Sequence, residues 1–194
     1  LPLTEAVDHF EAQSAQDVLV ETSGIAKVVA LSLHKIAGDL RLLGSGPATG
    51  LGELHLPALQ AGSSIMPGKV NPVIPEAVQQ VAAQVVGNDA AITFAATAST
   101  LQLNTAMPVM ADNLLESLRL IANVSTLLAV SCVAGLTVDA DTMRRHAGSS
   151  PAIVTALNPL IGYEAGARIA KRAVAERRTI RELVLEEGLL DEAT

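Results

Sequence analysis

Three long stretches of this chain carry apolar residues around most of a helical circumference, and this constrains the fold more than any other feature. The apolar residues recur at helical multiples over residues 4–43, 75–98 and 108–132, with Thr4 as a possible N-cap and Gly44 as the stop of the first stretch. Aromatic residues make up only 2% of the chain and Trp is absent, so Ala, Val, Leu and Ile must fill the interior. Such side chains suit closely packed helices. The sequence therefore predicts an all-α fold with long antiparallel helices in a central bundle.

The same apolar circumference predicts that these helices have partners. A helix that is apolar on every side is buried, and three such helices cannot surround one another. We therefore expect further helices from additional sequence or from other subunits. Ser, Asn, Asp, Gln or Lys interrupts each stretch before it reaches the roughly 18 residues of a membrane-spanning helix, which predicts a soluble protein. Gly24, inside the first stretch, predicts a close contact with another helix.

The composition of the sequence and the length of its helical segments change after Gly135. Short helical pieces are expected at about 139–146, 150–157, 163–176 and 179–187, and they are more charged and are separated by Gly and Pro. Thr179 and Glu182 have the spacing of a capping box, and Gly188 stands where a helix-ending glycine belongs. We therefore divide the chain into a part of the central bundle, residues 1–134, and a small C-terminal helical domain, residues 135–194.

Charge and cysteine content exclude several classes of protein. The net charge is −7 and no cluster of Lys and Arg is long enough to follow a phosphate backbone, so nucleic acid is not an expected partner. Cys132 is the only cysteine, which excludes an intramolecular disulfide and a cysteine metal cluster and agrees with a reducing cytoplasm. The four histidines show no metal-ligand spacing. Leu1 opens the chain without a Met, so we expect the natural start to lie upstream.

A long segment without helical period, residues 44–74, separates the first two stretches. It is roughly thirty residues long, where most connections in compact domains have about 4–6, and such loops are usually functional. Lys69 is its only Lys or Arg, beside the hydroxyls of Ser63 and Ser64 and the amide of Asn71. One cation among such donors can bind a carboxylate and stabilise the dianion formed when a neighbouring proton is removed. The plainer alternative is a Gly-Ser turn next to a solvated lysine.

The segment Gly62-Ser63-Ser64-Ile65-Met66-Pro67-Gly68-Lys69-Val70-Asn71 resembles a family signature. It is similar, at every fixed position, to Gly-Ser-Ser-x-Met-Pro-x-Lys-x-Asn of the fumarase/aspartase superfamily, and the resemblance extends to residues 45–47, 50–53, 87–89, 103–104 and 154–163. It implies the C-terminal part of a lyase that acts on a small dicarboxylate or amino acid without an organic cofactor or a metal. It also implies a homotetramer with active sites shared between subunits, and a missing N-terminal domain and start of the central domain.

The resemblance also implies roles for individual residues. Ser63 is the proton acceptor, and Ser64, Lys69 and Asn71 contact the substrate. Gly62 supports the loop, and Glu76 partners a histidine that comes from an earlier segment. The implied reaction removes the proton on the carbon β to the leaving group and then expels ammonia or water to leave fumarate. A serine hydroxyl is a poor base, so this chemistry requires loop N–H groups, with Lys69, to stabilise the alkoxide.

Local motifs favour one substrate but leave others open. Residues 73–76, Val-Ile-Pro-Glu, and residues 101–104, Leu-Gln-Leu-Asn, look like aspartate ammonia-lyase, whereas residues 50–53 and 66–69 are at least as familiar from class II fumarases. We expect reversible deamination of L-aspartate to fumarate, with fumarate hydratase as the alternative. A third possibility is a non-catalytic helical fragment, which the mass of the intact source protein would identify. Ala48 stands where the family usually has Arg, so closure of the loop could differ here.

Overall fold

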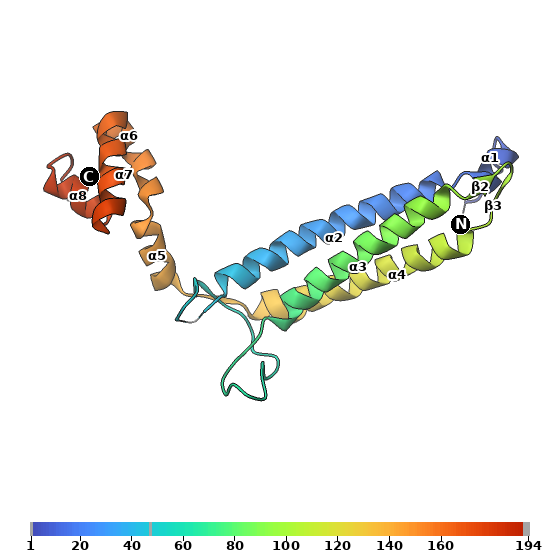
Figure 1. The fold of residues 1–194 in the computed structure, drawn as a ribbon, viewed down its shortest axis with the longest axis horizontal. Helices are drawn as coiled ribbons and strands as arrows, with labels where there is room; N and C mark the ends of the chain where they lie inside the picture. The colour runs from blue at the N-terminus through green and yellow to red at the C-terminus, as the bar shows by residue number, and fades with distance from the viewer. Residues whose placement is uncertain (1, 47, 192–194) are drawn as a thin grey trace. The chain divides into compact units, whose positions relative to one another are not determined.

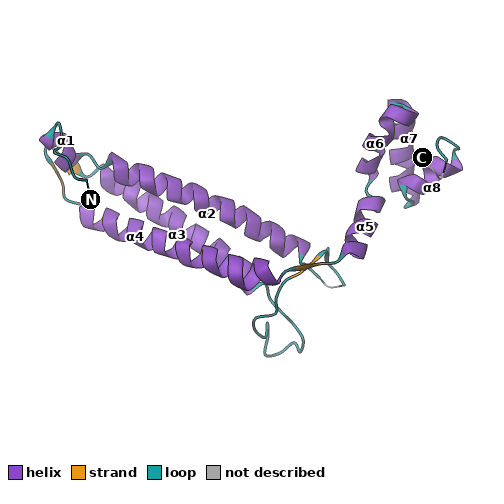
Figure 2. Cartoon of the chain, turned by 180° about the vertical axis from the view of Figure 1, so that it is seen from behind, coloured by secondary structure: helices purple, strands orange, loops and turns teal. Residues whose placement is uncertain are grey.

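The computed structural model describes residues 2–46 and 48–191, and the fold is all-α, as the sequence predicts (Figure 2). The chain divides into two compact units, Leu1–Thr137 and Val138–Thr194. The first unit contains α1 (His9–Ser14), α2 (Asp17–Leu43), α3 (Val73–Ala96) and α4 (Met107–Leu127). The second contains α5 (Ala140–Ser149), α6 (Val154–Ile161), α7 (Tyr163–Glu176) and α8 (Ile180–Glu186). The strands are pairs of residues: β1 (Leu54–His55), β2 (Ser99–Thr100), β3 (Leu103–Asn104) and β4 (Thr137–Val138).

The first unit is a bundle in which α2, α3 and α4 lie side by side along their lengths (Figure 1). α1 and the hairpin of β2 and β3 lie at one end of the bundle, and the loop between α2 and α3 lies at the other. In the hairpin Ser99 pairs with Asn104 in antiparallel register. The Asn104 amide donates to the carbonyl of Ala95 at 3.2 Å, which ties the hairpin to the end of α3. β1 and β4 form a second two-stranded sheet.

The expected single helix over residues 4–43 is wrong, because the chain breaks between α1 and α2. Ala15 has φ −80° and ψ 131°, which is extended backbone. The N-cap of α1 is Asp8 rather than Thr4, and Asp8 Oδ1 accepts hydrogen bonds from the backbone N–H groups of Phe10 at 2.9 Å and Glu11 at 3.1 Å. The stop at Gly44 is confirmed.

The other two long helices form where the apolar period predicts them, with shifted ends. α3 covers Val73–Ala96 where residues 75–98 are expected, so Pro75 lies inside the first turn. α4 ends at Leu127 and continues as a π-helix over Leu128–Cys132 and a 3-10 turn over Val133–Gly135. Cys132 is buried in this stretch, and burial raises the pKa of its thiol. Apolar spacing cannot separate an α-helix from a short π-helix that continues it.

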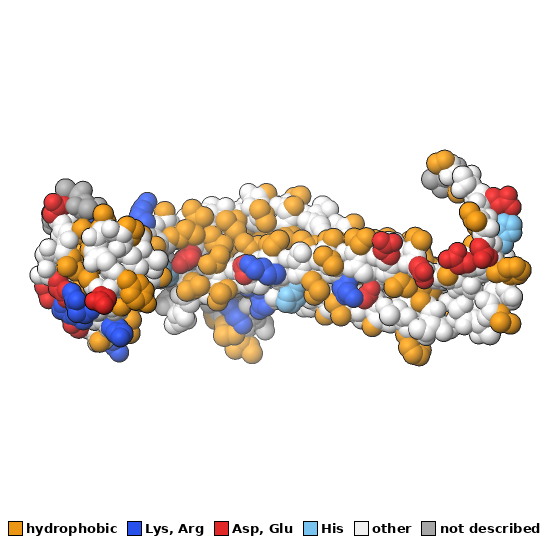
Figure 3. Space-filling model, turned by 90° about the horizontal axis from the view of Figure 1, so that it is seen from above, with side chains coloured by type: hydrophobic (Ala, Val, Ile, Leu, Met, Phe, Trp, Pro, Cys, Tyr) orange, Lys and Arg blue, Asp and Glu red, His pale blue; other side chains and the backbone are white. Residues whose placement is uncertain are grey.

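The inner face of α2 consists of small side chains. Its buried residues are Ser23, Ala26, Ala30 and Ala37. Four larger residues of the same helix, Leu19, Val20, Leu33 and Leu40, are half-buried against the core. Other large apolar residues lie on its outside, and hydrophobic side chains cover much of the bundle in Figure 3. Those on α2 are Val18, Ile25, Val28, Val29, Leu31, Ile36 and Leu42. The close helix contact predicted at Gly24 is not made within this chain, since a Cβ built there would meet nothing within 4 Å among the described residues.

α4 with its π and 3-10 continuation forms one apolar helix, Met107–Gly135. Its mean hydropathy reaches 1.6 over an 18-residue window, so by length and composition alone it could cross a membrane. The expectation that every apolar stretch is too short is therefore wrong for this helix. Core helices of soluble proteins have the same composition, and this one leaves Leu115, Leu118 and Val130 exposed on the bundle.

A buried polar layer crosses the middle of the bundle. Asp89 on α3 is 6% exposed and accepts hydrogen bonds from Ser23 Oγ at 2.8 Å and Lys27 Nζ at 2.5 Å, both on α2. Burial alone would raise the pKa of Asp89, but the hydrogen bonds from Lys27 and Ser23 and the charge of Lys27 outweigh it and hold that pKa below its ordinary value. On the other side of α3, Asn88 donates to Ser117 Oγ of α4 at 3.1 Å. The three helices are thus linked by specific polar contacts as well as by packing.

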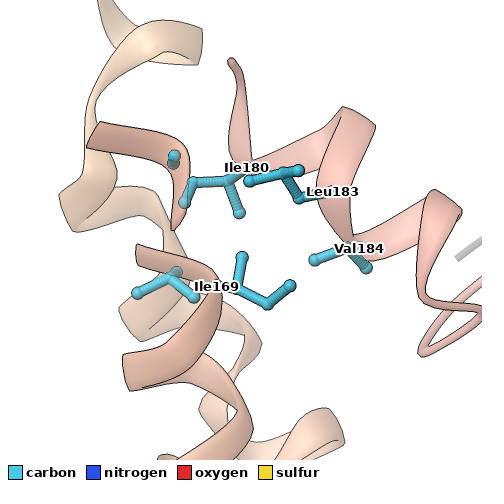
Figure 4. Packing of buried hydrophobic residues seen from close by; sticks show 6 residues of the cluster. Ile169, Ile180, Leu183 and Val184 are labelled. Atoms are coloured by element: carbon cyan, nitrogen blue, oxygen red, sulfur yellow. The ribbon is translucent and has the colours of Figure 1, made fainter. Parts of the chain in front are cut away.

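The second unit has a hydrophobic core of its own (Figure 4). Ile169 of α7 packs against Ile180, Leu183 and Val184 of α8, and all four side chains are buried. The predicted capping box is confirmed: Thr179 Oγ1 accepts from the Glu182 N–H, and the Glu182 carboxylate accepts from the Thr179 N–H. Gly188 has φ +63°, as the predicted helix-ending glycine requires.

The surface of the second unit carries a charged network. Arg172 contacts Glu176, Glu186 and Glu187 at 2.6–3.0 Å. Its neighbours Arg168 and Arg178 contact members of the same acidic group.

Candidate functional site

The loop that carries the signature begins by folding back on the end of α2. The Glu53 N–H donates to the Leu43 carbonyl at 2.9 Å, and the Gly52 N–H donates to the Ser45 carbonyl at 2.7 Å. A Cβ at Gly50 would lie 2.4 Å from the Ser45 carbonyl carbon, so only glycine fits there. Ala48 lies within this turn, while Pro47 of the same motif lies outside the described residues.

The signature itself closes into a small ring. The Gly62 N–H donates to the Lys69 carbonyl at 2.8 Å, and the Asn71 Nδ2 donates to the Gly62 carbonyl at 3.3 Å. A Cβ at Gly62 would lie 2.8 Å from the Lys69 carbonyl oxygen. Gly62 is therefore the residue that lets both ends of the signature meet. Asn71 uses one of its two amide hydrogens to close the ring and keeps the other for a further acceptor.

Ser63 lies inside this ring with two N–H groups aimed at its hydroxyl oxygen. The backbone N–H groups of Ile65 and Met66 each donate to Ser63 Oγ at 3.1 Å. An oxygen that accepts two N–H hydrogen bonds is stabilised more strongly when it is negatively charged than when it is neutral. This arrangement favours the alkoxide form of Ser63. The same geometry also occurs in ordinary serine turns.

Ser64 and Lys69 lie on the exposed side of the ring. Over residues 2–46 and 48–191, neither the Ser64 hydroxyl nor the Lys69 ammonium group has a hydrogen bond or an ion pair. Both groups therefore face solvent and are open to an anionic ligand. The structure brings Gly62, Ser63 and Asn71 together with the Lys69 backbone, while the Lys69 ammonium group makes no contact with Ser63.

Glu76 lies apart from the ring, in the first turn of α3, and has a partner that the sequence did not reveal. Arg41 Nη2, from the last turn of α2, lies 3.6 Å from Glu76 Oε1, and Arg41 Nη1 donates to Gln79 Oε1. These three residues line an open cavity of about 410 Å³ together with Gln80 and Ala83. Sequence reasoning missed Arg41 because it is an ordinary polar position on α2. Its one visible signal is that it is the last cation before the loop.

The described residues offer little to a metal ion. Among them, no group of three or more His, Cys, Asp and Glu side chains lies close enough together to hold one. His55 lies in β1 and is exposed. The groups that the loop itself presents are the serine oxygen, the lysine charge and the amide and backbone donors.

Two family models match this chain. The model described as "Lyase" matches residues 1–87, which include the signature, and the model described as "Fumarase C C-terminus" matches residues 153–194. The first match thus covers α1, α2, the loop and most of α3, and the other lies within the second unit.

Two bacterial lyases are similar to this chain over almost its whole length. Fumarate hydratase class II from Mycobacterium tuberculosis is 57% identical over 188 residues, covering 97% of this chain, and aspartate ammonia-lyase from Pseudomonas fluorescens is 52% identical over 192 residues, covering 99%. The chain spans 40% of the length of each. A crystal structure of fumarate lyase:delta crystallin from Brucella melitensis bound to cobalt is 47% identical with a TM-score of 0.92, and covers all of this chain and 42% of that one.

Proposed function

Because this chain belongs to the fumarase/aspartase superfamily of lyases, we propose that it supplies the loop that forms fumarate by elimination from a four-carbon dicarboxylate. The observation that carries the proposal is the pair of N–H groups directed at Ser63 Oγ. A serine hydroxyl is a poor base in water, and these two donors are the stabilisation that an alkoxide requires.

In the proposed reaction Ser63 removes the proton on the carbon β to the leaving group. The electron pair of the broken C–H bond moves into the adjacent carboxylate, which becomes a dianion. The ammonium group of Lys69 and the free amide hydrogen of Asn71 bind that carboxylate, and their attraction grows as its charge grows. The pair then returns to form the double bond while the C–O or C–N bond breaks. The ammonium group of aspartate leaves directly as ammonia, whereas the hydroxyl of malate takes a proton from a general acid of another segment and leaves as water. Ser64 contacts the substrate, and Glu76 holds a histidine supplied by another segment.

Hydration of fumarate to malate is the first candidate for the substrate pair. Fumarate hydratases of Mycobacterium and Corynebacterium match this chain with 57–58% identity, whereas the aspartate ammonia-lyases and the fumarate hydratase class II 2 of Pseudomonas aeruginosa match with 51–52%. The second candidate is deamination of L-aspartate, which Val73-Ile74-Pro75-Glu76 and Leu101-Gln102-Leu103-Asn104 favour. These motifs lie at the start of α3 and around the β2–β3 hairpin, so the whole-chain identity and the local motifs point to different substrates.

We further propose a homotetramer in the cytoplasm, with active sites that residues of several subunits complete. Large apolar side chains of α2 and α4, such as Ile25, Ile36, Leu115 and Val130, are exposed in the single chain. Equivalent helices of other subunits would cover them. Such a bundle also explains why α4 has the composition of a membrane span without entering a membrane.

The test is steady-state kinetics of Ser63→Ala and Lys69→Met in the full-length protein, with malate and aspartate supplied separately and fumarate followed. Ser63→Ala should lower kcat by orders of magnitude with little change in KM, because only a transition-state interaction is lost. Lys69→Met should raise KM and lower kcat, because the cation binds both ground and transition states. Whichever substrate yields fumarate identifies the enzyme.

Ser32→Ala on α2 is the matched control, since Ser32 Oγ only donates to the Val28 carbonyl of its own helix. It should leave kcat and assembly unchanged. Near-normal turnover of Ser63→Ala on both substrates would remove the serine from the mechanism. In that case Ser63 is a turn residue and Lys69 a solvated charge.

A further inference from the structure

Arg41 joins the helix before the catalytic loop to the helix after it. It lies in the last turn of α2, two residues before that helix ends at Leu43, and its guanidinium group reaches two side chains of the first turns of α3. One branch lies 3.6 Å from a carboxylate oxygen of Glu76, and the other donates to the amide oxygen of Gln79. A planar guanidinium held at both branches has a fixed orientation, which a flexible lysine cannot reproduce.

The contact is not needed to dock the two helices. Directly beneath it Ala37 of α2 and Val78 of α3 are fully buried, and Leu40 and Ile74 pack against them. This apolar cluster already holds the ends of α2 and α3 together. The ion pair itself is partly exposed, with 42% of the Arg41 side chain and 34% of the Glu76 side chain accessible, so it adds little to stability. Its specific effect is on the direction of the Glu76 carboxylate.

That direction leaves one carboxylate oxygen available. Arg41 approaches Oε1 of Glu76, and over residues 2–46 and 48–191 Oε2 has no hydrogen-bond partner. Glu76 and Arg41 both line the open cavity of about 410 Å³. A donor that enters this cavity from another segment can therefore meet a carboxylate whose orientation is already set. Fixing the orientation in advance removes an entropic cost from the step that uses it.

We propose that Arg41 is a positioning residue of the lyase, acting through Glu76 with Gln79 as its second anchor. The inference rests on the proposed function, in which Glu76 holds a histidine of the active site. Arg41 touches neither substrate nor reacting atoms. Its loss should therefore slow the chemical step while leaving substrate binding by Lys69 and Asn71 intact.

The experiment compares Arg41→Met, Arg41→Lys and Gln79→Leu in the full-length protein, with folding and assembly verified first. Arg41→Met should lower kcat roughly ten- to hundredfold with KM within about twofold of wild type, because a misdirected carboxylate costs on that order. Arg41→Lys should recover only part of the loss, since lysine can hold Glu76 or Gln79 but not both. Gln79→Leu should give a smaller decrease of the same kind. The matched control is Arg119→Met, whose arginine forms an exposed ion pair with Glu116 on α4.

A double-mutant cycle separates positioning from a general structural effect. If Arg41 acts through Glu76, Arg41→Met should reduce kcat no further when Glu76 is already Gln. Additive losses, or normal kcat for Arg41→Met and Arg41→Lys, would overturn the inference. If Arg41→Met does not fold, the kinetics of Arg41→Lys and Gln79→Leu test the inference instead. A normal kcat for both of these variants would overturn the positioning role of Arg41. An active Ser63→Ala enzyme overturns the proposed function, whereas an inactive Ser63→Ala beside a normal Arg41→Met overturns only the role of Arg41.

Discussion

The two units of this chain bury their apolar side chains in opposite ways. In the second unit Ile169, Ile180 and Leu183 turn inward and an outer layer of Arg and Glu faces solvent. In the bundle α2 turns its Ala and Ser residues inward and leaves Ile25 and Ile36 outside. A unit that covers its own core can stand alone, whereas a bundle in which α2 leaves several large apolar residues on the surface needs other helices. One chain thus combines a domain that covers its own core with a bundle whose exposed apolar residues fit the proposed assembly.

The largest expected effect tests whether the outer face of α2 is an interface. Ile25→Asp places a carboxylate where the proposed tetramer excludes water, which costs several kcal/mol at each copy. The assembled mass should therefore fall towards that of smaller species at micromolar concentration, as measured by light scattering of the full-length protein. Val174→Asp on α7 is the matched control because Val174 and Ile25 are similarly exposed, at 65% and 60%. Equal masses for both variants and wild type would show that the two surfaces do not differ.

The next effect concerns the polar layer that only the bundle contains. Lys27→Met leaves Asp89 buried and charged without its cation, a loss that costs about 3–5 kcal/mol for fully buried pairs. Since 37% of the Lys27 side chain is accessible, we expect the lower end of that range in urea unfolding. Lys35→Met is the control, because Lys35 pairs with Asp39 on the exposed side of the same helix, and it should change stability by less than about 0.5 kcal/mol. Similar losses in both variants would contradict a special role for the layer.

The smallest effect separates the two units by their response to acid and salt. Hydrogen bonds from Arg172 lower the pKa of Glu176, and hydrogen bonds from Arg172 and Arg178 lower the pKa of Glu186, below the ordinary value of 4.5. This stabilisation is complete above pH 4.5 and disappears as the pH falls through the lowered pKa values. The protection of amides in α7 and α8 against hydrogen exchange, measured relative to their intrinsic exchange rates, should therefore fall in acid.

Salt distinguishes the exposed network from the buried layer. At 1 M salt the screening length falls to about 3 Å, so exposed ion pairs weaken while buried ones change little. Exchange in α7 and α8 should become faster in 1 M salt at pH 7, and exchange around Asp89 should stay nearly constant. Salt-independent exchange in the second unit would show that its charged surface is solvated and contributes no measurable stability.

The helical fold was predictable from the sequence, but the inward face of the first long helix was not. Val18, Ile25, Val29 and Ile36 form a regular apolar stripe, which a single chain would be expected to bury. The structure buries the Ala side instead, because small residues let α2 approach α3 closely and leave the stripe for further helices. Periodicity finds an apolar face without saying which molecule covers it. The break at Ala15 carries no Pro or Gly, and so it was not predictable either.

Only some features of the candidate site were likewise predictable from the sequence. The signature identified Ser63, Lys69 and Asn71, and elementary acid–base chemistry required N–H donors around the serine oxygen. That Ile65 and Met66 supply those donors follows from the turn of the backbone, which the sequence alone does not determine. Arg41 and Glu76 lie far apart in the sequence and meet only because α2 and α3 pack together. Local pattern therefore found the residues of the loop, while the contact at its base required the tertiary fold.

The polar layer around Asp89 also fixes how α2 and α3 are aligned along their lengths, up to the end of the bundle that carries the loop. The buried apolar residues of α2 are Ala26, Ala30 and Ala37, and such small residues on successive turns differ little in shape, so they oppose a slide of one turn, about 5.4 Å, less strongly than large residues would. Only one alignment places Ser23 and Lys27 on Asp89. A slide would separate Arg41 from Glu76 and shift the loop's two anchor points relative to each other. The hydrogen bonds of Asp89 inside the bundle thus determine the relative positions of Arg41, Glu76 and the ends of the loop.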